Sequence, residues 1–552
     1  MIKRNFIFLL SIFLLLYINT TTTATQDYIR RNIDIDRSPK NILIGSYIGG
    51  RSHLKPMLDI AAILIERGHN VILLTSGNYT PSSEYPTVKQ ISLRNSLNFK
   101  ETKKLAEAYK NDYERIAVII EQSLKTYNNI IEDYKNVAKE YEIDLFFCDI
   151  LINDACLDIA NILKKPVVGF SSFFQFIAPV SHKSDPLFHC SISLENESFL
   201  ERFRCMIIQP IKMSFIFYPL ANQLNNVRKQ VNIKPDQLSF GNIPKVTLAL
   251  VDTFFGFELP QSLPPNVQEI GPVLSEEYPT LTLELSDFIN KHKRVLYVAF
   301  GTYFTTTVEN NSKLLQSFVE AINENIIDGV VWALSQTHKD DFYPTLNLID
   351  GSQLQASSIL NNEHPHIHIV KFAPQFAVLN HTNIKLFLSH GGAGSIHESL
   401  YTGTPMLIFP LGADQTGNGE KLKSAGVALT LNKFNLDVND IKNKIDILLK
   451  DEDVKKNLKR MEVLAKISSK RKYRAADSIE YILYSSSLNE GIDEEFLNEW
   501  IPADVRMGFI KRNNYDVYGA LLGIILGFVG GILWVTFKLT RFIVNDQKPK
   551  KE

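Results

Sequence analysis

The sequence predicts an α/β protein with two doubly wound parallel sheets and one membrane-spanning helix near its C-terminus. The chain has 552 residues, enough for two globular domains. In each half, apolar runs of strand length alternate with amphipathic helical patterns, which is typical of parallel sheets joined by helices. The apolar run 517–537 has no charged residue and is long enough to cross a bilayer.

The first α/β domain is predicted to cover 25–275. A Gly49-Gly50 turn separates its first strand from a helix, and Gly68 ends that helix. Strand, helix and strand at this spacing imply parallel pairing. The predicted elements are a strand at 41–47, a helix at about 55–66, and strands at 71–76, 143–150 and 166–170.

Residues 172–222 of this domain are apolar but are interrupted by Pro179, Pro210 and Pro219. Because proline breaks the hydrogen-bond pattern of a helix, no straight spanning helix is expected here. Two interpretations stay open. The segment forms helices that line an apolar pocket and touch a membrane surface, or it is ordinary core.

The second α/β domain is predicted to cover 276–455, after a linker near 273–293. A charged, helical segment at 456–516 follows it. Its predicted strands lie at 294–302, 330–334, 366–374 and 386–388, and a helix starts at about 395.

The two ends of the chain predict membrane targeting. Residues 1–24 have a basic start, an apolar run and a small-residue patch, which indicates a secretory signal peptide. The tail 538–552 carries five basic residues, which predicts a cytoplasmic tail and a lumenal body. Lys548 and Lys550, fifth and third from the end, resemble a retrieval signal for the endoplasmic reticulum; the alternative is a basic tail near anionic lipid. The expected topology is single-pass type I.

Composition excludes several other classes. The net charge of −1 gives no field that would attract nucleic acid. No Cys/His cluster has metal-ligand spacing, so no metal site is expected. The four cysteines are too few for a disulfide framework, although a Cys190–Cys205 bridge is open. Glycines in 519–531 have the spacing of helix-pairing motifs, which leaves a homo-oligomer open. Sequons for N-glycosylation begin at Asn78, Asn196, Asn310 and Asn380.

The segment 387–418, FLSHGGAGSIHESLYTGTPMLIFPLGADQTGN, is the most informative part of the chain. A buried strand leads into a glycine turn and then into a helix. Unpaired N–H groups at such a helix start form a natural seat for phosphate. A histidine precedes the glycines, a glutamate lies inside the helix, and Asp414-Gln415 follows a second strand.

This segment resembles the signature of the UDP-glycosyltransferases, the UDP-glucuronosyl and UDP-glucosyl transferase family. The resemblance extends from about residue 40 to the C-terminus. It implies two facing Rossmann-like domains of the GT-B type, with the first binding the acceptor and the second binding the UDP-sugar. It also implies that the helices after 455 return to brace the first domain.

His53, on the loop after the first strand, is the candidate general base. An imidazole with a pKa near 6.5 suits this role at neutral pH, and the family places its catalytic histidine here. Asp149 matches the carboxylate that supports the imidazolium. Asp144 and Asp154 are rival carboxylates, but Asp144 begins its strand, at the wrong end for a cleft. His69 is expected to pack between helix and strand.

The resemblance assigns a set of UDP-sugar-binding residues in the second domain. It implies that Gly301 and Thr302 form a turn near the phosphates, that Phe372 stacks on uracil and that Gln375 bonds the uracil edge. The implied phosphate cradle consists of His390, Gly391, Gly392, Gly394 and Ser395. Glu398 is the implied carboxylate on the ribose, Asp414 and Gln415 are the pair that holds the sugar hydroxyls, and Asn418 completes that segment.

Three positions depart from the family pattern. Phe372 stands where tryptophan is usual and offers less stacking area. Gly394 stands where asparagine is common, which removes one side-chain donor. Gln261 stands where glucuronosyl-type members often carry arginine, and the missing cation favours a neutral hexose such as glucose over glucuronate.

The sequence therefore predicts an inverting UDP-glycosyltransferase of the endoplasmic reticulum membrane. It transfers a hexose from a UDP-sugar to a hydroxyl of a small lipophilic acceptor, without a metal. A nucleotide-linked dehydrogenase is disfavoured because no G-x-G-x-x-G follows an early strand. The alternatives are a non-enzymatic carrier of sterols or other lipids, and a transferase that acts on protein or polysaccharide.

Overall fold

The structure is a computed structural model of the chain. It describes residues 38–75, 84–93, 112–172, 184, 190–233, 246–302, 305–335, 337–488 and 507–546. The predicted signal peptide, Asn78, Pro179 and the lysines of the predicted retrieval signal lie outside the described residues. Every candidate site residue lies inside them.

The first sheet is fully parallel and has seven strands in the order β3-β2-β1-β4-β5-β6-β7. The strands are β1 (Asn41–Ser46), β2 (Asn70–Thr75), β3 (Lys89–Ser92), β4 (Leu145–Asp149), β5 (Val167–Ser171), β6 (Leu248–Val251) and β7 (Val267–Glu269). The strand order reverses between β1 and β4. Ligands of doubly wound sheets bind outside the carboxyl ends of the strands at such a reversal.

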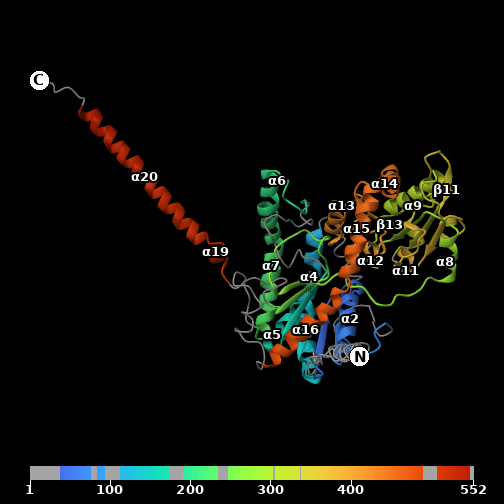
Figure 1. The fold of residues 1–552 in the computed structure, drawn as a ribbon, viewed down its shortest axis with the longest axis horizontal. Helices are drawn as coiled ribbons and strands as arrows, with labels where there is room; N and C mark the ends of the chain where they lie inside the picture. The colour runs from blue at the N-terminus through green and yellow to red at the C-terminus, as the bar shows by residue number, and fades with distance from the viewer. Residues whose placement is uncertain are drawn as a thin grey trace, which may run out of the picture. The chain divides into compact units, whose positions relative to one another are not determined.

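Helices cover both faces of this sheet (Figure 1). Leu43 of β1 packs into a core with α4, α5 and α7, whereas its neighbours Ile42 and Ile44 pack into a second core with α2 and α16 (Arg471–Leu488). This alternation follows from the two-residue period of a strand. The helices are α2 (Arg51–Glu66), α4 (Asp112–Glu140), α5 (Asp154–Ile162), α6 (Phe199–Phe203), the π-helix η3 (Arg204–Ile208) and α7 (Gln209–Gln230).

The second sheet is also parallel and has six strands in the order β12-β9-β8-β13-β14-β15. The strands are β8 (Val295–Ala299), β9 (Gly329–Ala333), β12 (Ile367–Val370), β13 (Ile384–Ser389), β14 (Met406–Ile408) and β15 (Ala428–Thr430), and a small antiparallel pair is formed by β10 (Thr345–Asn347) and β11 (Gln353–Gln355). Its order reverses between β8 and β13. The prediction of two parallel α/β sheets is confirmed.

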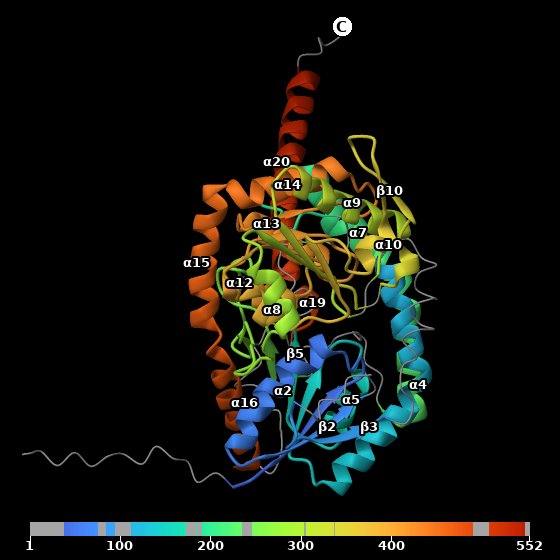
Figure 2. The ribbon, with the colours of Figure 1, turned by 90° about the vertical axis from the view of Figure 1, so that its right-hand side faces the viewer.

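The helices of the second sheet precede a C-terminal pair that returns to the first. They are α8 (Leu283–Asn290), α9 (Val308–Asn323), η5 (Lys339–Asp341), α10 (Ala356–Leu360), α11 (Gln375–Leu379), α12 (Ala393–Thr402), α13 (Gln415–Ser424) and α14 (Val438–Lys450). The pair is α15 (Glu452–Ser468) and α16 (Arg471–Leu488), seen in Figure 2 beside α12 and α2 respectively. Glu480 of α16 bonds Arg67 and the buried His69 at the end of α2.

Among the described residues of 172–222, no helix is long and apolar enough to span a membrane, as expected. Pro210 and Pro219 nevertheless do not end a helix. α6, η3 and α7 follow one another without a gap from Phe199 to Gln230. Pro210 lies at the first turn of α7, directly after the π-helical turn, where the helix register changes. Pro219 lies inside α7. Many of the large apolar side chains here are exposed, so this helix is not ordinary core.

The cysteines form two disulfides. The Cys190–Cys205 bridge is present, and Cys148 at the end of β4 pairs with Cys156 on α5. The second bridge was not predicted because its residues are eight positions apart, on a strand and a helix that only the tertiary fold brings together.

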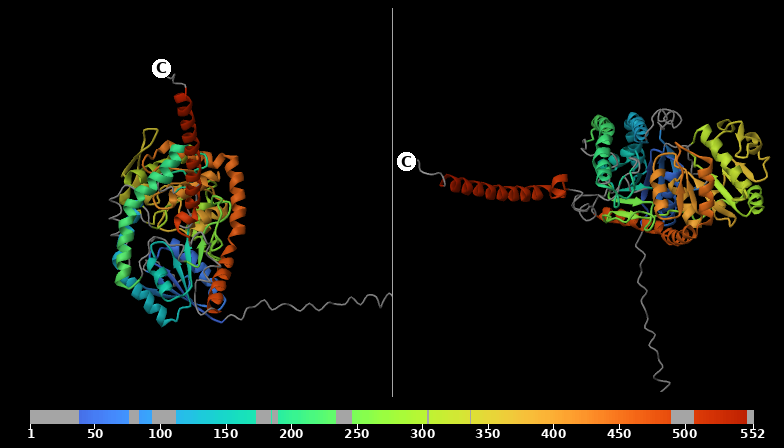
Figure 3. Two further views of the ribbon diagram at one scale, coloured as in Figure 1. Left: turned by 90° about the vertical axis from the view of Figure 1, so that its left-hand side faces the viewer. Right: turned by 90° about the horizontal axis from the view of Figure 1, so that it is seen from above.

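The C-terminal apolar run forms one long helix. After α19 (Phe509–Arg512), α20 covers Tyr515–Asp546, and Tyr515–Ile543 is long and apolar enough to cross a membrane. Figure 3 shows α20 as an unbroken helix. The predicted C-terminal apolar helix is confirmed, and its length fits a membrane anchor.

Candidate functional site

His53 follows one of the two strands that flank the reversal in the first sheet, and Asp149 ends the other. His53 is the third residue of α2, directly after the β1 turn, and Asp149 ends β4. The Nδ1 atom of His53 lies 3.2 Å from Oδ2 of Asp149. The His53 side chain is 18% exposed and the Asp149 side chain only 1%, so the imidazole stays accessible while its partner is buried.

The charge around His53 favours its protonated form. Burial by itself would lower the pKa of His53, but the charge of Asp149, its hydrogen bond and the charge of Asp414 raise the pKa above 6.5. Asp149 is held in turn by Ser46, whose hydroxyl donates to the same Oδ2 at 2.9 Å, and by the Leu151 amide, which donates to Oδ1.

The rival carboxylates have structural partners elsewhere. Asp144 accepts a hydrogen bond from the backbone N–H of Asn41, at the opposite end of the strands. Asp154 lies 3.2 Å from the guanidinium of the buried Arg228.

In the second sheet, the glycine turn leads from β13 into α12. Gly391 has a φ of 87°, a conformation that favours glycine. Gly392 is the N-cap of α12 and has no side chain. No side-chain cap therefore accepts a hydrogen bond from the backbone amides of Ala393, Gly394 and Ser395. A Cβ added at Gly394 would contact nothing within 4 Å, so a side chain at that position has room.

His390 lies against both glycine turns as a neutral imidazole. Burial lowers the pKa of His390 to about 4, although a hydrogen bond with the backbone of Ala299 acts in the opposite direction. A Cβ at Gly301 or Gly392 would approach Nε2 of His390 to 2.8 or 2.6 Å, so only glycine fits at either position. Thr302 follows Gly301 and is exposed. The positive potential of this turn therefore comes from backbone N–H groups rather than from a histidine cation.

Gln375, Ser395 and Glu398 form one hydrogen-bonded corner. The amide nitrogen of Gln375 donates to Oγ of Ser395 at 3.1 Å and to Oε2 of Glu398 at 2.8 Å. Burial raises the pKa of Glu398 to about 7, although Gln375, Lys55 and Arg51 oppose the shift. Phe372 is 66% exposed, which leaves its ring open for a stacking partner.

Asp414, Gln415 and Asn418 lie at the start of α13. The side-chain amide of Asn418 donates to the carbonyl of Gly391 and to Oδ2 of Asp414, so it joins the glycine turn to α13. Gln415 is buried and its Oε1 accepts hydrogen bonds from the backbone N–H groups of Leu411 and Gly412. The carbonyl end of Gln415 thus stabilises its own turn.

Charges of the first sheet act on residues of the second. His53 and Asp414 shift the pKa of each other, and Arg51 and Lys55 act on Glu398. Arg51 and Lys55 both bond Glu84. Sequence reasoning missed Ser46, Arg51 and Lys55, although Arg51 and Lys55 lie within two residues of His53, and that spacing was a usable signal.

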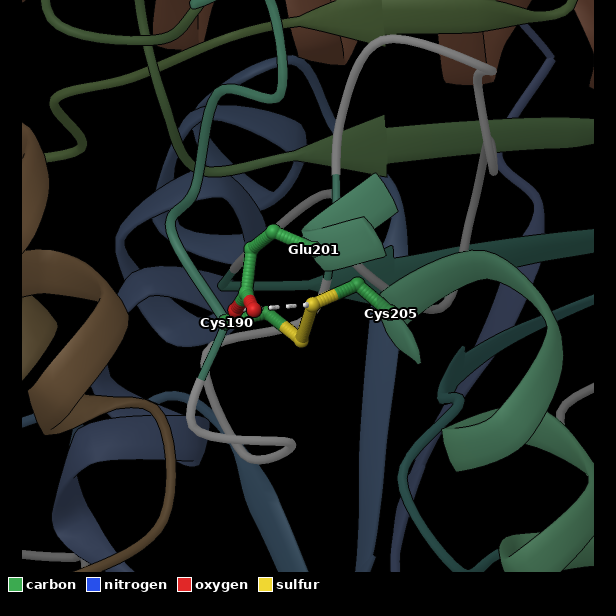
Figure 4. A group of neighbouring side chains, drawn as sticks. All are labelled: Cys190, Glu201 and Cys205. Carbon is green, nitrogen blue, oxygen red and sulfur yellow. Dashed lines mark hydrogen bonds between the residues drawn. A yellow bond between two sulfur atoms is a disulfide. The ribbon is translucent and has the colours of Figure 1, made fainter. Parts of the chain in front are cut away.

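Among the described residues, one group has the composition of a metal site. Its members are Cys190, Glu201 and Cys205 (Figure 4). Both sulfur atoms are bonded to each other in the disulfide, and a metal ligand must be a free thiolate. This group therefore does not offer a metal site in the structure.

Known proteins are similar to this chain over most of its length. Residues 49–483 match the family described as "UDP-glucoronosyl and UDP-glucosyl transferase". The chain belongs to this family. It is a UDP-dependent glycosyltransferase, as the sequence predicted.

Individual relatives show the same relation. This transferase is 29% identical to a UDP-glycosyltransferase of Talaromyces amestolkiae, over 91% of its own chain and 99% of the relative. It is 23% identical to human UDP-glucuronosyltransferase 1A6, over 88% of each chain. Among solved structures it is similar to Phytolacca americana UGT2, solved with UDP-2fluoro-glucose and pterostilbene, with a TM-score of 0.54, 17% identity, and coverage of 80% of this chain and 100% of that one. This likeness confirms the GT-B fold.

Proposed function

We propose that this transferase moves a neutral hexose, glucose in preference to glucuronate, from its UDP-sugar to a hydroxyl of a small lipophilic acceptor, with inversion at the anomeric carbon. The observation that carries the mechanism is the His53–Asp149 pair, 3.2 Å apart, with the charge of Asp414 from the second domain acting on the same imidazole.

His53 acts as the general base. In the tautomer that donates its Nδ1–H to Asp149, Nε2 carries the lone pair that accepts the proton of the acceptor hydroxyl. The acceptor oxygen then bonds to the anomeric carbon as the bond from that carbon to UDP breaks. The imidazolium that forms is stabilised by the buried Asp149 carboxylate.

The leaving diphosphate rests on the first turn of α12. The amides of Ala393, Gly394 and Ser395 and the partial charge of the helix N-terminus stabilise the growing negative charge. His390 contributes as a neutral donor. With these groups the reaction needs no metal. Phe372 stacks on uracil, Glu398 bonds the ribose, and Asp414 with Gln415 orients the hexose.

The donor preference rests on Gln261. Its side-chain nitrogen and oxygen are buried and have no hydrogen-bond partner among the described residues. A neutral amide at this position offers no cation for a glucuronate carboxylate. Both donors occur among similar proteins: one relative is named a UDP-glucuronosyltransferase, and the plant structure was solved with UDP-2fluoro-glucose.

The acceptor preference rests on the first domain. The cavity next to the β1 turn, lined by Tyr47, Tyr127 and Leu224 among others, has a volume of only about 20 Å³, which is room for about one water molecule. It is too small for the acceptor, so we infer the lipophilic preference from the apolar composition of residues 172–222.

We place the body of the chain in the lumen of the endoplasmic reticulum, anchored by α20. In that setting the sequons differ in accessibility. Asn196 and Asn380 are exposed. Asn310 is 8% exposed and its amide nitrogen donates to Thr306 and to the Lys433 carbonyl, so the folded protein has no room for a glycan there. Asn196 and Asn380 are therefore the better acceptors.

The test is a panel of UDP-sugars supplied to membranes that contain the transferase, with a lipophilic phenol as acceptor. We expect product with an added hexose mass and β configuration from the α-linked donor. An added hexuronate mass would contradict the donor assignment, and a retained configuration would contradict the mechanism. A lipid carrier without enzymatic activity would release no UDP, and a transferase for protein or polysaccharide would leave the phenol unmodified.

A further inference from the structure

The continuous helix formed by α6, η3 and α7 exposes a large set of apolar side chains. Phe199, Leu200 and Phe215 are each at least 70% exposed and Tyr218 is 68% exposed. Positions 199, 203, 207, 211 and 215 repeat every four residues, which places them along one side of a helix. We call this set the apolar face: Phe199, Leu200, Phe203, Met206, Ile207, Ile208, Ile211, Phe215 and Tyr218.

The other side of the same helix packs inward. Cys205, Leu220, Leu224 and Arg228 are buried, and α7 contacts α4. The helix is therefore already anchored to the first domain, and the apolar face is a surface left over after folding. Soluble monomers rarely expose apolar patches of this extent unless the patch binds something. Figure 1 shows α6 and α7 in line as one rod.

We propose that the apolar face lies on the lipid bilayer into which α20 inserts. A short stretch of chain connects α16, which packs on the first domain, to α19 and α20. α16 ends at Leu488 and α19 begins at Phe509. The connecting chain reaches at most about 70 Å when fully extended, at roughly 3.5 Å per residue. The first domain thus stays within about 70 Å of the membrane, and this tether lowers the entropic cost of contact with lipid.

The charges next to the apolar face favour the same partner. Between Phe199 and Tyr218, the exposed charged residues are Arg202 and Lys212, both basic. Glu201, the acidic residue of this stretch, is paired with Arg204 on the same helix. Basic side chains beside an exposed apolar stripe are the composition of helices that lie in the membrane interface, with their cations at the headgroups.

The test uses full-length protein in lipid nanodiscs, with one chain per disc. In a Trp534→Phe background, which removes the tryptophan of α20, Phe215→Trp places a reporter on the apolar face. Phe434→Trp is the matched control, because Phe434 is 77% exposed but lies after β15 in the second domain. Acyl chains carrying bromine quench tryptophan only at close range.

We expect brominated lipid to quench most of the fluorescence added by Phe215→Trp and little of that added by Phe434→Trp. Ile211→Trp, on the same row, should behave like Phe215→Trp. Equal quenching at positions 215 and 434 would overturn the proposal. A second copy of this chain is the other candidate partner. Emission from position 215 that is unquenched in single-chain discs, and shifts to the blue only with two chains per disc, would also overturn the proposal.

Discussion

Ser46 is the residue that connects the β1 turn to the candidate catalytic pair. Its Oγ donates to Oδ2 of Asp149, and the Gly49 amide donates to the same Oγ. Ser46 is fully buried, so it acts on the reaction only through Asp149 and the Gly49 turn that leads to His53. It is a positioning residue.

Removing this hydroxyl should change the pH profile. In Ser46→Ala, Asp149 loses one donor and its negative charge acts more strongly on His53. The pKa of His53, already raised, should rise further, and the acid limb of kcat/KM should move to higher pH. We expect kcat to fall about five- to tenfold, the worth of one hydrogen bond. Ser46→Thr keeps the hydroxyl and should restore the profile. An unchanged acid limb in Ser46→Ala would rule out this role.

We expect the charged form of Glu398 to lower the free energy of unfolding while it strengthens nucleotide binding. Its pKa is raised to about 7 by burial, so the charged form is disfavoured in the fold. The protonated Glu398 side chain therefore contributes stability that is fully present below its ordinary pKa of 4.5 and is lost as pH rises through about 7. Glu398→Gln should therefore increase the free energy of unfolding at pH 8 by on the order of 2 kcal/mol, and by little at pH 4.5, while UDP binds more weakly. Denaturant titrations at both pH values and calorimetry with UDP measure this. Equal effects at both pH values would contradict the burial argument.

At the scale of single residues, the resemblance predicted which side chains lie close together but not their electrostatics. His53 and Asp149 were predicted as a pair and lie 3.2 Å apart. The neutral state of His390, whose pKa burial lowers to about 4, was not predicted. Burial depends on residues distant in sequence, so the motif alone gave no indication of it.

At the scale of elements, a buried ion pair joins α13 to the segment after β6. Nζ of Lys421 lies 2.5 Å from Oε2 of Glu258, and the two side chains are 4% and 1% exposed. Lys421→Met would leave the Glu258 carboxylate buried without its cation. We expect a loss of about 3–5 kcal/mol in unfolding free energy. The double variant Lys421→Met/Glu258→Gln should recover much of this loss. A single variant as stable as the parent protein would show that the pair contributes nothing.

Strands and helices with clear periodicity were predictable, and the exceptions have local causes. The strands β1, β4 and β5 are short apolar runs buried on both faces, which the sequence shows directly. Pro210 and Pro219 do not end a helix: Pro210 lies in the first turn of α7, directly after the π-helical turn, and Pro219 lies inside α7. β15 has three residues and no pattern of its own.

At the scale of the whole molecule, the two sheets are coupled by charge and by packing. Tyr278 of the linker stacks on Phe376 of α11, with ring centroids 3.9 Å apart, and Ser275 donates to Asp59 of α2. α16 carries Glu480 back to the end of α2. The two-domain architecture followed from alternating strands and helices. The return of α15 and α16 to the first domain was implied by the family resemblance. The Tyr278–Phe376 and Ser275–Asp59 contacts were not predicted, because each joins residues that no local pattern relates.

The central claim is that His53 removes the acceptor proton opposite a UDP-sugar held by the second domain. The most direct measurement is single-turnover transfer by His53→Ala beside calorimetric UDP binding, with the exposed His338→Asn as control. We predict that the transfer rate falls about 10²- to 10⁴-fold while UDP affinity changes little, and that His338→Asn behaves like the parent protein. Near-normal transfer by His53→Ala would contradict the account.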